Sequence, residues 1–259
     1  MNENNKGKPK NLPQKKTIAK QPVVVSSAPQ FPMRINKYLA FKQYSTRRGA
    51  DELIEKKHVF INGRLAVLGD KVNQSDTVDV HYRGKPKTYV YFAFNKPIGT
   101  ITHSPQHGEK DIKHSVALKD VFPLGRLDKA SHGLIILTND GRITDKLLNP
   151  DYAHEKEYLV KTKEKLRTSF KQKMEAGVNI EGYQTKPCKV DILNENTFKV
   201  RLTEGKKHQI RRMCSALFQE VADLKRTKIV NIELGNLASG SFRAIEGKEL
   251  EVFLKSLGF

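Results

Sequence analysis

The stretch Gly125–Gly141, GRLDKASHGLIILTNDG, decides the fold of this chain. The run Leu134–Leu137 within it is wholly apolar and must be buried. Arg126 and Asp128 stand two residues apart just before this run, and side chains two apart in a strand share a face. We therefore expect both to emerge together at the lip of the core. A carboxylate in that place is costly unless it is paired, so the pattern fits either an ion pair that closes a loop or a functional site.

Charge and length set the wider frame. The chain has 259 residues, more than one average domain needs, so we expect two domains. It carries 47 Lys and Arg against 28 Asp and Glu, a formal net charge of +19. An excess of this size favours a polyanionic partner. Most of it falls after residue 80, so the polyanion is expected to contact both folded parts.

Several classes of protein are disfavoured. No apolar stretch approaches the roughly 18 residues that span a bilayer, and the first ten residues lack the apolar centre of a signal peptide. Cys188 and Cys214 are the only cysteines and cannot by themselves form a disulfide framework or a metal cluster. We therefore expect a cytoplasmic protein with no membrane partner and no metal.

The N-terminal third divides into two segments. Residues 1–32 hold six lysines, one glutamate and five prolines, which is typical of a disordered basic arm. This arm is either a solubilising tail or a loose grip on phosphates. From Met33 the pattern predicts a helix, then a second helix capped by Ser45 or Thr46. A hairpin around Asn62-Gly63 follows.

The segments MRINKYLA, STRRGADELIEKKHVFING and DTVDV resemble the S4 RNA-binding domain over residues 33–80. The resemblance implies an RNA-facing surface made by Arg34, Lys37, Arg47 and Arg48. Residues 81–88, which include RGKPK, are expected to be a linker to a second domain at residues 89–259.

Patterns in the second domain supply further polar groups. A strand over Thr88–Phe94 leads into a turn that offers Lys96 near its end. The alternation in HEKEYLV predicts a strand with Tyr158 among core residues. Residues 206–218 predict an amphipathic helix that places Arg211 beside its apolar stripe and Arg212 toward solvent or phosphate.

The motifs GRLD, GLIILTND, KEYLV, HQIRRM and DLKRTKI occur in an order that resembles the ribosomal RNA pseudouridine synthases that carry an S4 domain, closest to subgroup F of the large-subunit enzymes. The resemblance implies that Asp128 is the catalytic aspartate, Tyr158 a stacking tyrosine and Arg211 the arginine that pairs with the aspartate. It implies that Arg126 enters the RNA helix and that Leu224 lines the pocket. Lys96 and Arg212 are further candidates for contact with the substrate.

The resemblance also implies the fold and the partner. It implies an α+β chain in which a small α/β S4 domain precedes a catalytic domain with a large, mainly antiparallel sheet flanked by helices. The reaction is the isomerisation of uridine and needs no cofactor. The expected substrate is ribosomal RNA, as a 23S hairpin or an assembly intermediate, and the enzyme is expected to be a monomer. The alternative is a non-catalytic, ribosome-associated RNA-binding factor.

Overall fold

The computed structural model describes residues 30–42, 44–81, 88–103 and 111–259. The basic arm expected at residues 1–32 lies outside these ranges except for its last three residues. The expected linker at residues 81–88 is described only at its two ends. In the described part of the chain, none of the helices combines the length and the apolar character that a membrane crossing needs.

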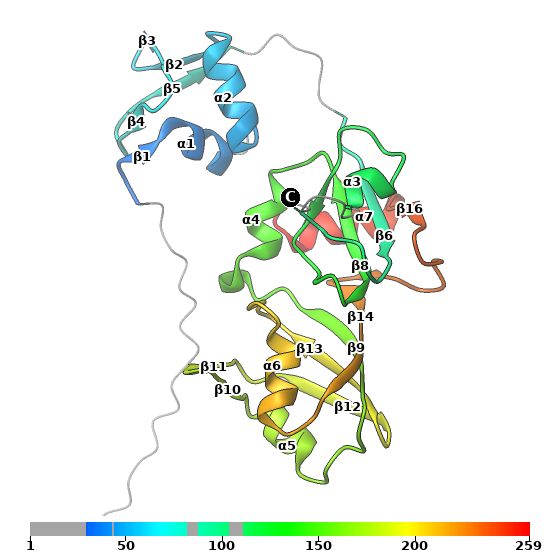
Figure 1. Cartoon of the computed structure of the whole chain (residues 1–259). Coiled ribbons are helices and arrows are strands. Elements are labelled where there is room, and N and C mark those ends of the chain that lie inside the picture. The colour runs from blue at the N-terminus through cyan, green and yellow to red at the C-terminus, as the bar shows by residue number, and fades with distance from the viewer. Residues whose placement is uncertain (1–29, 43, 82–87, 104–110) are drawn as a thin grey trace, which may run out of the picture. The chain divides into compact units, whose positions relative to one another are not determined.

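Residues 33–80 form a small α/β region with its own core (Figure 1). Its elements are β1 (Met33–Arg34), α1 (Ile35–Phe41), α2 (Arg47–Glu55), β2 (Val59–Ile61), β3 (Arg64–Leu65), β4 (Lys71–Val72) and β5 (Val78–Val80). β1 pairs with β4, and β3, β2 and β5 form a three-stranded sheet. The expected cap is confirmed, because the Thr46 hydroxyl accepts a hydrogen bond from the Gly49 amide at 2.9 Å. The first helix begins at Ile35, two residues later than predicted.

The Asn-Gly hairpin is also confirmed. β2 and β3 are joined by Asn62 and Gly63, which both adopt positive φ angles, of 50° and 76°. Two consecutive left-handed residues give the turn whose twist matches that of the flanking strands. The Asn62 side chain donates to Asp76 at 2.9 Å, which ties the turn to the chain before β5.

A nine-stranded sheet organises the rest of the chain (Figure 1). Its strands are β6 (Tyr91–Lys96), β7 (Phe122–Leu124), β8 (His132–Thr138), β9 (Lys156–Thr162), β12 (Lys189–Asn194), β13 (Thr197–Leu202), β14 (Val221–Ile229), β15 (Ile232–Glu233) and β16 (Phe242–Ala244). The order is β12-β13-β9-β14-β8-β6-β16, with β15 paired to β14 and β7 to β8. Every pair is antiparallel except β14 with β8, so the expected mainly antiparallel sheet is confirmed.

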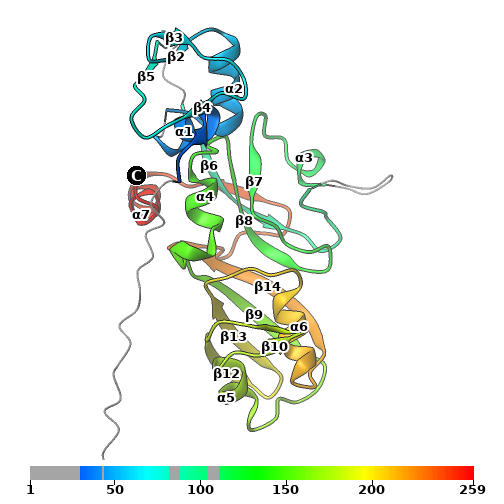
Figure 2. The same ribbon diagram turned by 90° about the vertical axis from the view of Figure 1, so that its left-hand side faces the viewer.

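Helices cover this sheet in two groups with separate cores (Figures 1 and 2). The helical elements are α3 (Ile112–Ser115), α4 (Ile143–Leu148), the short 3-10 helix η1 (Pro150–Tyr152), α5 (Phe170–Glu175), α6 (Gln209–Ala216) and α7 (Gly247–Ser256), and a separate hairpin consists of β10 (Asn179–Ile180) and β11 (Tyr183–Gln184). α4 and α7 share a core with β6 and β8, whereas α5 and α6 share one with β9, β12 and β13. The run Leu134–Leu137 is almost completely inaccessible to solvent, as its composition predicts.

The two halves of the sheet meet where β8 pairs with β14. That parallel contact has only two residue pairs, His132 with Lys225 and Gly133 with Arg226. Gly133 has a φ angle of +102°, and a Cβ atom built there would clash with the backbone carbonyl of Arg226. Glycine is therefore required at this crossing. The two halves of the sheet are therefore joined by a short contact between β8 and β14.

Candidate active site

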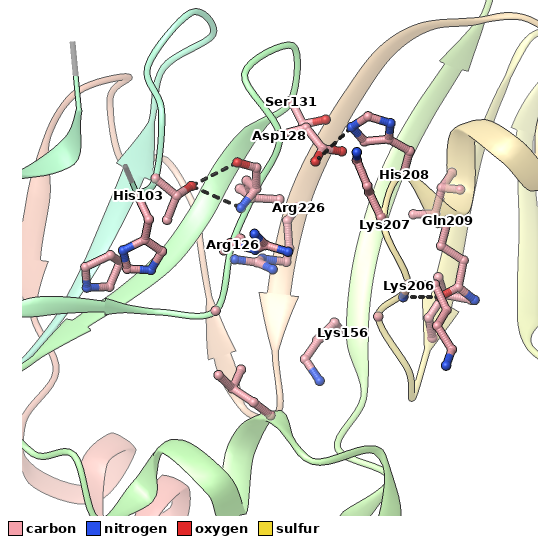
Figure 3. Close-up of a pocket in the computed structure, with 18 of the residues that line it drawn as sticks. His103, Arg126, Asp128, Ser131, Lys156, Lys206, Lys207, His208, Gln209 and Arg226 are labelled. Atoms are coloured by element: carbon pink, nitrogen blue, oxygen red, sulfur yellow. Dashed lines mark hydrogen bonds and ion pairs between the residues drawn. The ribbon is translucent and has the colours of Figure 1, made fainter. Parts of the chain in front are cut away.

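The GRLD segment forms a loop between β7 and β8 rather than a strand. The Thr102 hydroxyl donates to the Leu127 carbonyl at 2.9 Å and accepts from the Leu127 amide at 3.2 Å, while the Gly99 amide donates to the Lys129 carbonyl at 2.8 Å. Leu127 is thereby buried, and Arg126 and Asp128 on its two sides line the same cavity (Figure 3). The two side chains emerge together, as predicted, although the backbone that presents them is a clamped loop.

A cavity of about 870 Å³ lies over the junction of the two sheet halves. Leu224 and Arg226 come to it from β14, Lys156 and Tyr158 come from β9, and residues 205–208 form part of its rim. β9 and β14 are adjacent strands, and Arg226 pairs in register with Tyr158. Residues two apart on a strand share a face, so β14 presents Leu224 and Arg226 together.

The charge partner of Asp128 is a histidine. His208 Nε2 lies 3.4 Å from the Asp128 carboxylate, and the two side chains point toward each other (Figure 3). The side chain of His208 is 48% exposed and that of Asp128 is 37% exposed. His208 precedes α6 with a left-handed φ angle of 51°. Asp128 is therefore held at the mouth of the cavity and remains reachable by a ligand.

The expected ion pair between Arg211 and Asp128 is not present among the described residues. The Arg211 guanidinium donates instead to the Ala130 carbonyl at 2.9 Å and to the Val221 carbonyl at 3.2 Å. Because α6 begins only at Gln209, Arg211 lies in its first turn and reaches the backbone that follows Asp128. Arg211 thus braces the turn after Asp128 rather than the carboxylate itself.

Arg226 is one of three site residues that the sequence reasoning missed, with Lys156 and His208. It is only 4% exposed, and its Nε donates to the Leu134 carbonyl at 2.7 Å. Its guanidinium carbon lies 6.0 Å from the centre of the Tyr158 ring, and its Nη2 is buried without a hydrogen-bond partner among the described residues. An unpaired buried donor is costly, and this one belongs to a side chain on the cavity wall beside Tyr158. The signal was its place two residues after Leu224 on the same strand.

Lys96 does not lie where we expected it. Its side chain is completely buried, and its ammonium donates to the carbonyls of Thr100 at 2.7 Å and Pro97 at 3.0 Å. Burial lowers the pKa of Lys96 to about 8, the Asp128 carboxylate acts in the opposite direction, and Arg226 lowers it further. Lys96 therefore cannot contact a substrate in this structure, but its ammonium interacts electrostatically with the Asp128 carboxylate.

Lys156, on the cavity wall, is a second lysine with a lowered pKa. Burial lowers its pKa to about 8, and the positive charge of Arg226 contributes in the same direction. Its ammonium donates to the His154 carbonyl at 3.0 Å. Lys156 and Arg226 therefore place two basic side chains on the wall of the same cavity.

Tyr158 and Leu224 supply the apolar part of the cavity. Tyr158 is partly buried and packs against core clusters in both halves of the sheet. Leu224 is 5% exposed and pairs in register with Val160. The predicted strand around Tyr158 is confirmed as β9, with Val160 fully buried two residues further on.

Arg212 lies away from the cavity. Its Nη2 forms an ion pair with Glu181 at 2.6 Å and donates to the Ile180 carbonyl at 3.3 Å. It connects α6 to the β10–β11 hairpin, so the expectation that it contacts substrate is not supported by this geometry. The four S4 candidates, Arg34, Lys37, Arg47 and Arg48, are all exposed. No cluster of three or more metal-ligating side chains is found in the described part of the chain.

Family models and relatives among known proteins match most of this chain. Residues 33–78 match the S4 domain model, and residues 90–216 match the model of RNA pseudouridylate synthase. The chain is 40% identical over 231 residues to the dual-specificity RNA pseudouridine synthase RluF of Escherichia coli strain K12, covering 86% of this chain and 78% of that protein. It is 34% identical to the ribosomal large subunit pseudouridine synthase B of Bacillus subtilis strain 168, covering 84% of this chain and 94% of that protein.

A solved structure shows the same fold. The crystal structure of a pseudouridylate synthase superposes with a TM-score of 0.64 and 27% identity, over 87% of this chain and 99% of that one. An S4 region, a large sheet with flanking helices and two relatives well above 30% identity all agree. The chain therefore belongs to the RNA pseudouridine synthases that carry an S4 domain, enzymes that isomerise uridine to pseudouridine.

Proposed function

We propose that Asp128 is the group that acts on the ribose of a uridine flipped out of ribosomal RNA. The observation that carries this proposal is the position of its carboxylate at the mouth of the cavity, 3.4 Å from His208, with Lys156 and Arg226 lining the same cavity. Isomerisation breaks the bond between C1′ and N1 and forms one between C1′ and C5. An ionised carboxylate near the sugar can add to it or stabilise its positive charge.

The remaining cavity residues are suited to keep the detached base in place. Tyr158 offers an aromatic ring on which a base can stack, and Leu224 adds an apolar wall. Arg226, which lies beside Tyr158 on the cavity wall, adds a positive charge to the place proposed for the base. Over the whole reaction, C5 loses a proton and N1 gains one, so the atoms balance. Whether the carboxylate attacks C1′ or first promotes loss of a proton at C2′, the same residues hold the base.

The exposed groups beside the cavity serve the RNA outside the flipped nucleotide. Arg126 is exposed and adjacent to Asp128, where it can occupy the space that the uridine leaves. Extrusion of a paired base costs a few kcal/mol, and a side chain that fills the vacated position offsets part of this cost.

We assign the substrate to 23S ribosomal RNA, as a hairpin or an assembly intermediate. One bacterial relative is named a large-subunit enzyme and another is named dual-specificity, which supports large-subunit RNA and leaves room for a second target. A monomer acting in the cytoplasm completes the proposal. Mapping pseudouridines in ribosomal and transfer RNA from cells with and without the gene tests it, and identical maps would overturn it.

The decisive variant for the catalytic assignment is Asp128→Asn. It keeps the shape of the side chain but removes its charge, so single-turnover conversion should fall by at least about 10⁴-fold. Affinity for 23S RNA, measured by filter binding, should stay within about threefold. A variant that still converts uridine at a tenth of the normal rate would remove Asp128 from this role.

The S4 candidates have a separate test. Arg47→Glu combined with Arg48→Glu reverses two exposed charges that are proposed to contact phosphates. Affinity for 23S RNA should fall by about tenfold or more, and the dependence of affinity on salt should weaken. The rate at saturating RNA should change little. Unchanged affinity would show that the RNA does not contact this part of the S4 domain.

A further inference from the structure

The C-terminal end of α6 carries an aromatic side chain in an unusual position. Phe218 is 75% exposed, and its φ angle is +59°, in the left-handed region. The Phe218 amide donates to the Ser215 carbonyl at 2.9 Å, and the Gln219 amide donates to the Cys214 carbonyl at 2.9 Å. This is the hydrogen-bond pattern of a helix end whose left-handed residue is usually glycine.

Stability does not explain phenylalanine at this place. A bulky residue in the left-handed region is strained, and an exposed aromatic ring loses the gain that burial would provide. Gln219, the next residue, is buried and leads the chain toward β14. The backbone therefore needs the left-handed turn, but it does not need a large side chain there.

The surroundings of Phe218 are basic. The Arg167 guanidinium lies 5.1 Å from the centre of the Phe218 ring. Arg167, Lys173 and Phe218 line a small hollow of about 90 Å³ over the buried ring of Phe170. We call these three residues the α5–α6 patch.

The basic groups of this patch are uncompensated, unlike their neighbours along the chain. Lys163 pairs with Glu220 and Lys165 pairs with Glu195. Arg167 and Lys173 are both exposed, and the structure shows no ion pair for them within its described ranges. An open aromatic face bordered by free cations is the combination that binds an unpaired nucleotide, with stacking on the base and charge on the phosphates.

The patch lies within reach of an RNA bound at the active site. His208 precedes α6 at the mouth of the cavity and Phe218 follows its last turn. The eight residues of α6 between them correspond to about 12 Å at the helical rise. α5 and α6 contribute to the same core cluster, and α5 and the end of α6 both supply residues to the hollow beside Phe218.

We propose that the α5–α6 patch is a second RNA-contact site, in which Phe218 stacks on an unpaired nucleotide of the substrate RNA while Arg167 and Lys173 contact its phosphates. The proposal rests on the chain acting on RNA. It adds a contact outside the cavity that receives the uridine, and it gives the enzyme a way to select RNA by the unpaired nucleotides near the target.

The protein has no tryptophan, which makes a direct test possible. The Phe218→Trp variant reports stacking through its own fluorescence. Titration with 23S RNA transcribed in vitro should quench this fluorescence by about half or more. The matched control is Val252→Trp, at an exposed position of α7, and its fluorescence should stay constant. No quench at position 218 under conditions where the RNA is fully bound would overturn the proposal.

A second variant separates stability from binding. Phe218→Gly relieves the left-handed strain and removes an exposed ring, so the melting temperature should rise. Affinity for the same RNA should fall by about tenfold, the usual scale for one stacked base, while the rate at saturating RNA stays within twofold. An unchanged affinity, or a response of the tryptophan to RNA-free ribosomal proteins instead of RNA, would contradict the proposal. Loss of catalysis in Asp128→Asn is scored independently, so the two assignments can fail separately.

Discussion

The two ends of α6 present the same backbone problem with different solutions. His208 before the helix and Phe218 after it both adopt left-handed φ angles, of 51° and 59°, although neither is glycine. At the first end the side chain has a partner, because His208 lies 3.4 Å from the Asp128 carboxylate. At the second end the side chain is 75% exposed, and its ring lies beside the Arg167 guanidinium. A strained position is thus retained at both ends where the side chain has something to contact.

Gly133 shows the opposite situation. There the left-handed backbone coincides with a close approach of the Arg226 carbonyl, so a side chain has no room. At His208 and Phe218 glycine would fit and would relieve strain. Six other non-glycine residues, Lys57, Asn62, Asp120, Ala153, Glu181 and Val230, also have positive φ angles. The roles proposed for His208 and Phe218 therefore rest on their contacts and exposure together with the strain.

Replacing His208 tests the role of the side chain that precedes α6 at the mouth of the cavity. His208→Gly should raise the unfolding free energy by up to about 1 kcal/mol, because it relieves the left-handed strain. It also frees the Asp128 carboxylate to leave its position, so the single-turnover rate should fall by roughly 10- to 100-fold. Stopped assays of pseudouridine formation at saturating RNA, together with thermal denaturation, measure both effects.

The matched control for that variant is Phe218→Gly, which relieves the same kind of strain at the other end of α6. It should leave the rate intact and weaken RNA binding, whereas His208→Gly should leave binding intact and lower the rate. If both variants lower the rate equally, the effect comes from a general loosening of α6, and His208 has no specific role in holding Asp128.

The pH dependence of stability tests the lowered pKa values of Lys96 and Lys156. Burial lowers the pKa of Lys96 to about 8 from its ordinary value of 10.5. Between these two values the unfolded chain binds the proton and the folded chain does not, so the unfolding free energy should rise as pH increases from about 8 to 10.5. The rise contributed by Lys156 has the same sign and covers the same range.

Lys96→Met removes one of these two contributions. Urea denaturation across this pH range should show a smaller rise than in the unchanged protein. At neutral pH the variant should be less stable by on the order of 1–3 kcal/mol, because the Pro97 and Thr100 carbonyls lose their donor. A rise of full size in the variant would show that Lys96 titrates normally.

How much of this site could be read from the sequence depended on how local each interaction is. The Asn62-Gly63 turn, the buried run Leu134–Leu137 and the strand at Tyr158 follow from short-range chemistry, and all are confirmed. The position of Arg126 beside Asp128 at the cavity was also predicted, although both residues lie in a hydrogen-bonded loop and not in a strand.

The partners of long side chains could not be read in this way. Lys96 is the last residue of β6 and was expected to lie in the turn after the strand, where lysine is usually solvated. Instead, the loop after it supplies the carbonyls that accept hydrogen bonds from its ammonium. Arg211 was expected to pair with Asp128, but its guanidinium donates to the Ala130 carbonyl instead. Arg226 was predictable in principle, because the spacing from Leu224 places it on the cavity face of β14. Arg226 was not predicted as a cavity residue because arginine is rarely buried.

The smallest expected effect concerns Arg212, which lies on α6 between the two contrasted ends. Its ion pair with Glu181 is 2.6 Å long, but the Glu181 side chain is 78% exposed. Exposed pairs of this kind contribute about 0.2–1 kcal/mol, so Arg212→Ala should lower the unfolding free energy by no more than about 1 kcal/mol. Turnover and RNA affinity should both stay within twofold, since the guanidinium points to the β10–β11 hairpin and not to the cavity. A large loss of affinity would place RNA along the whole of α6, and the two sites at its ends would then belong to one continuous surface.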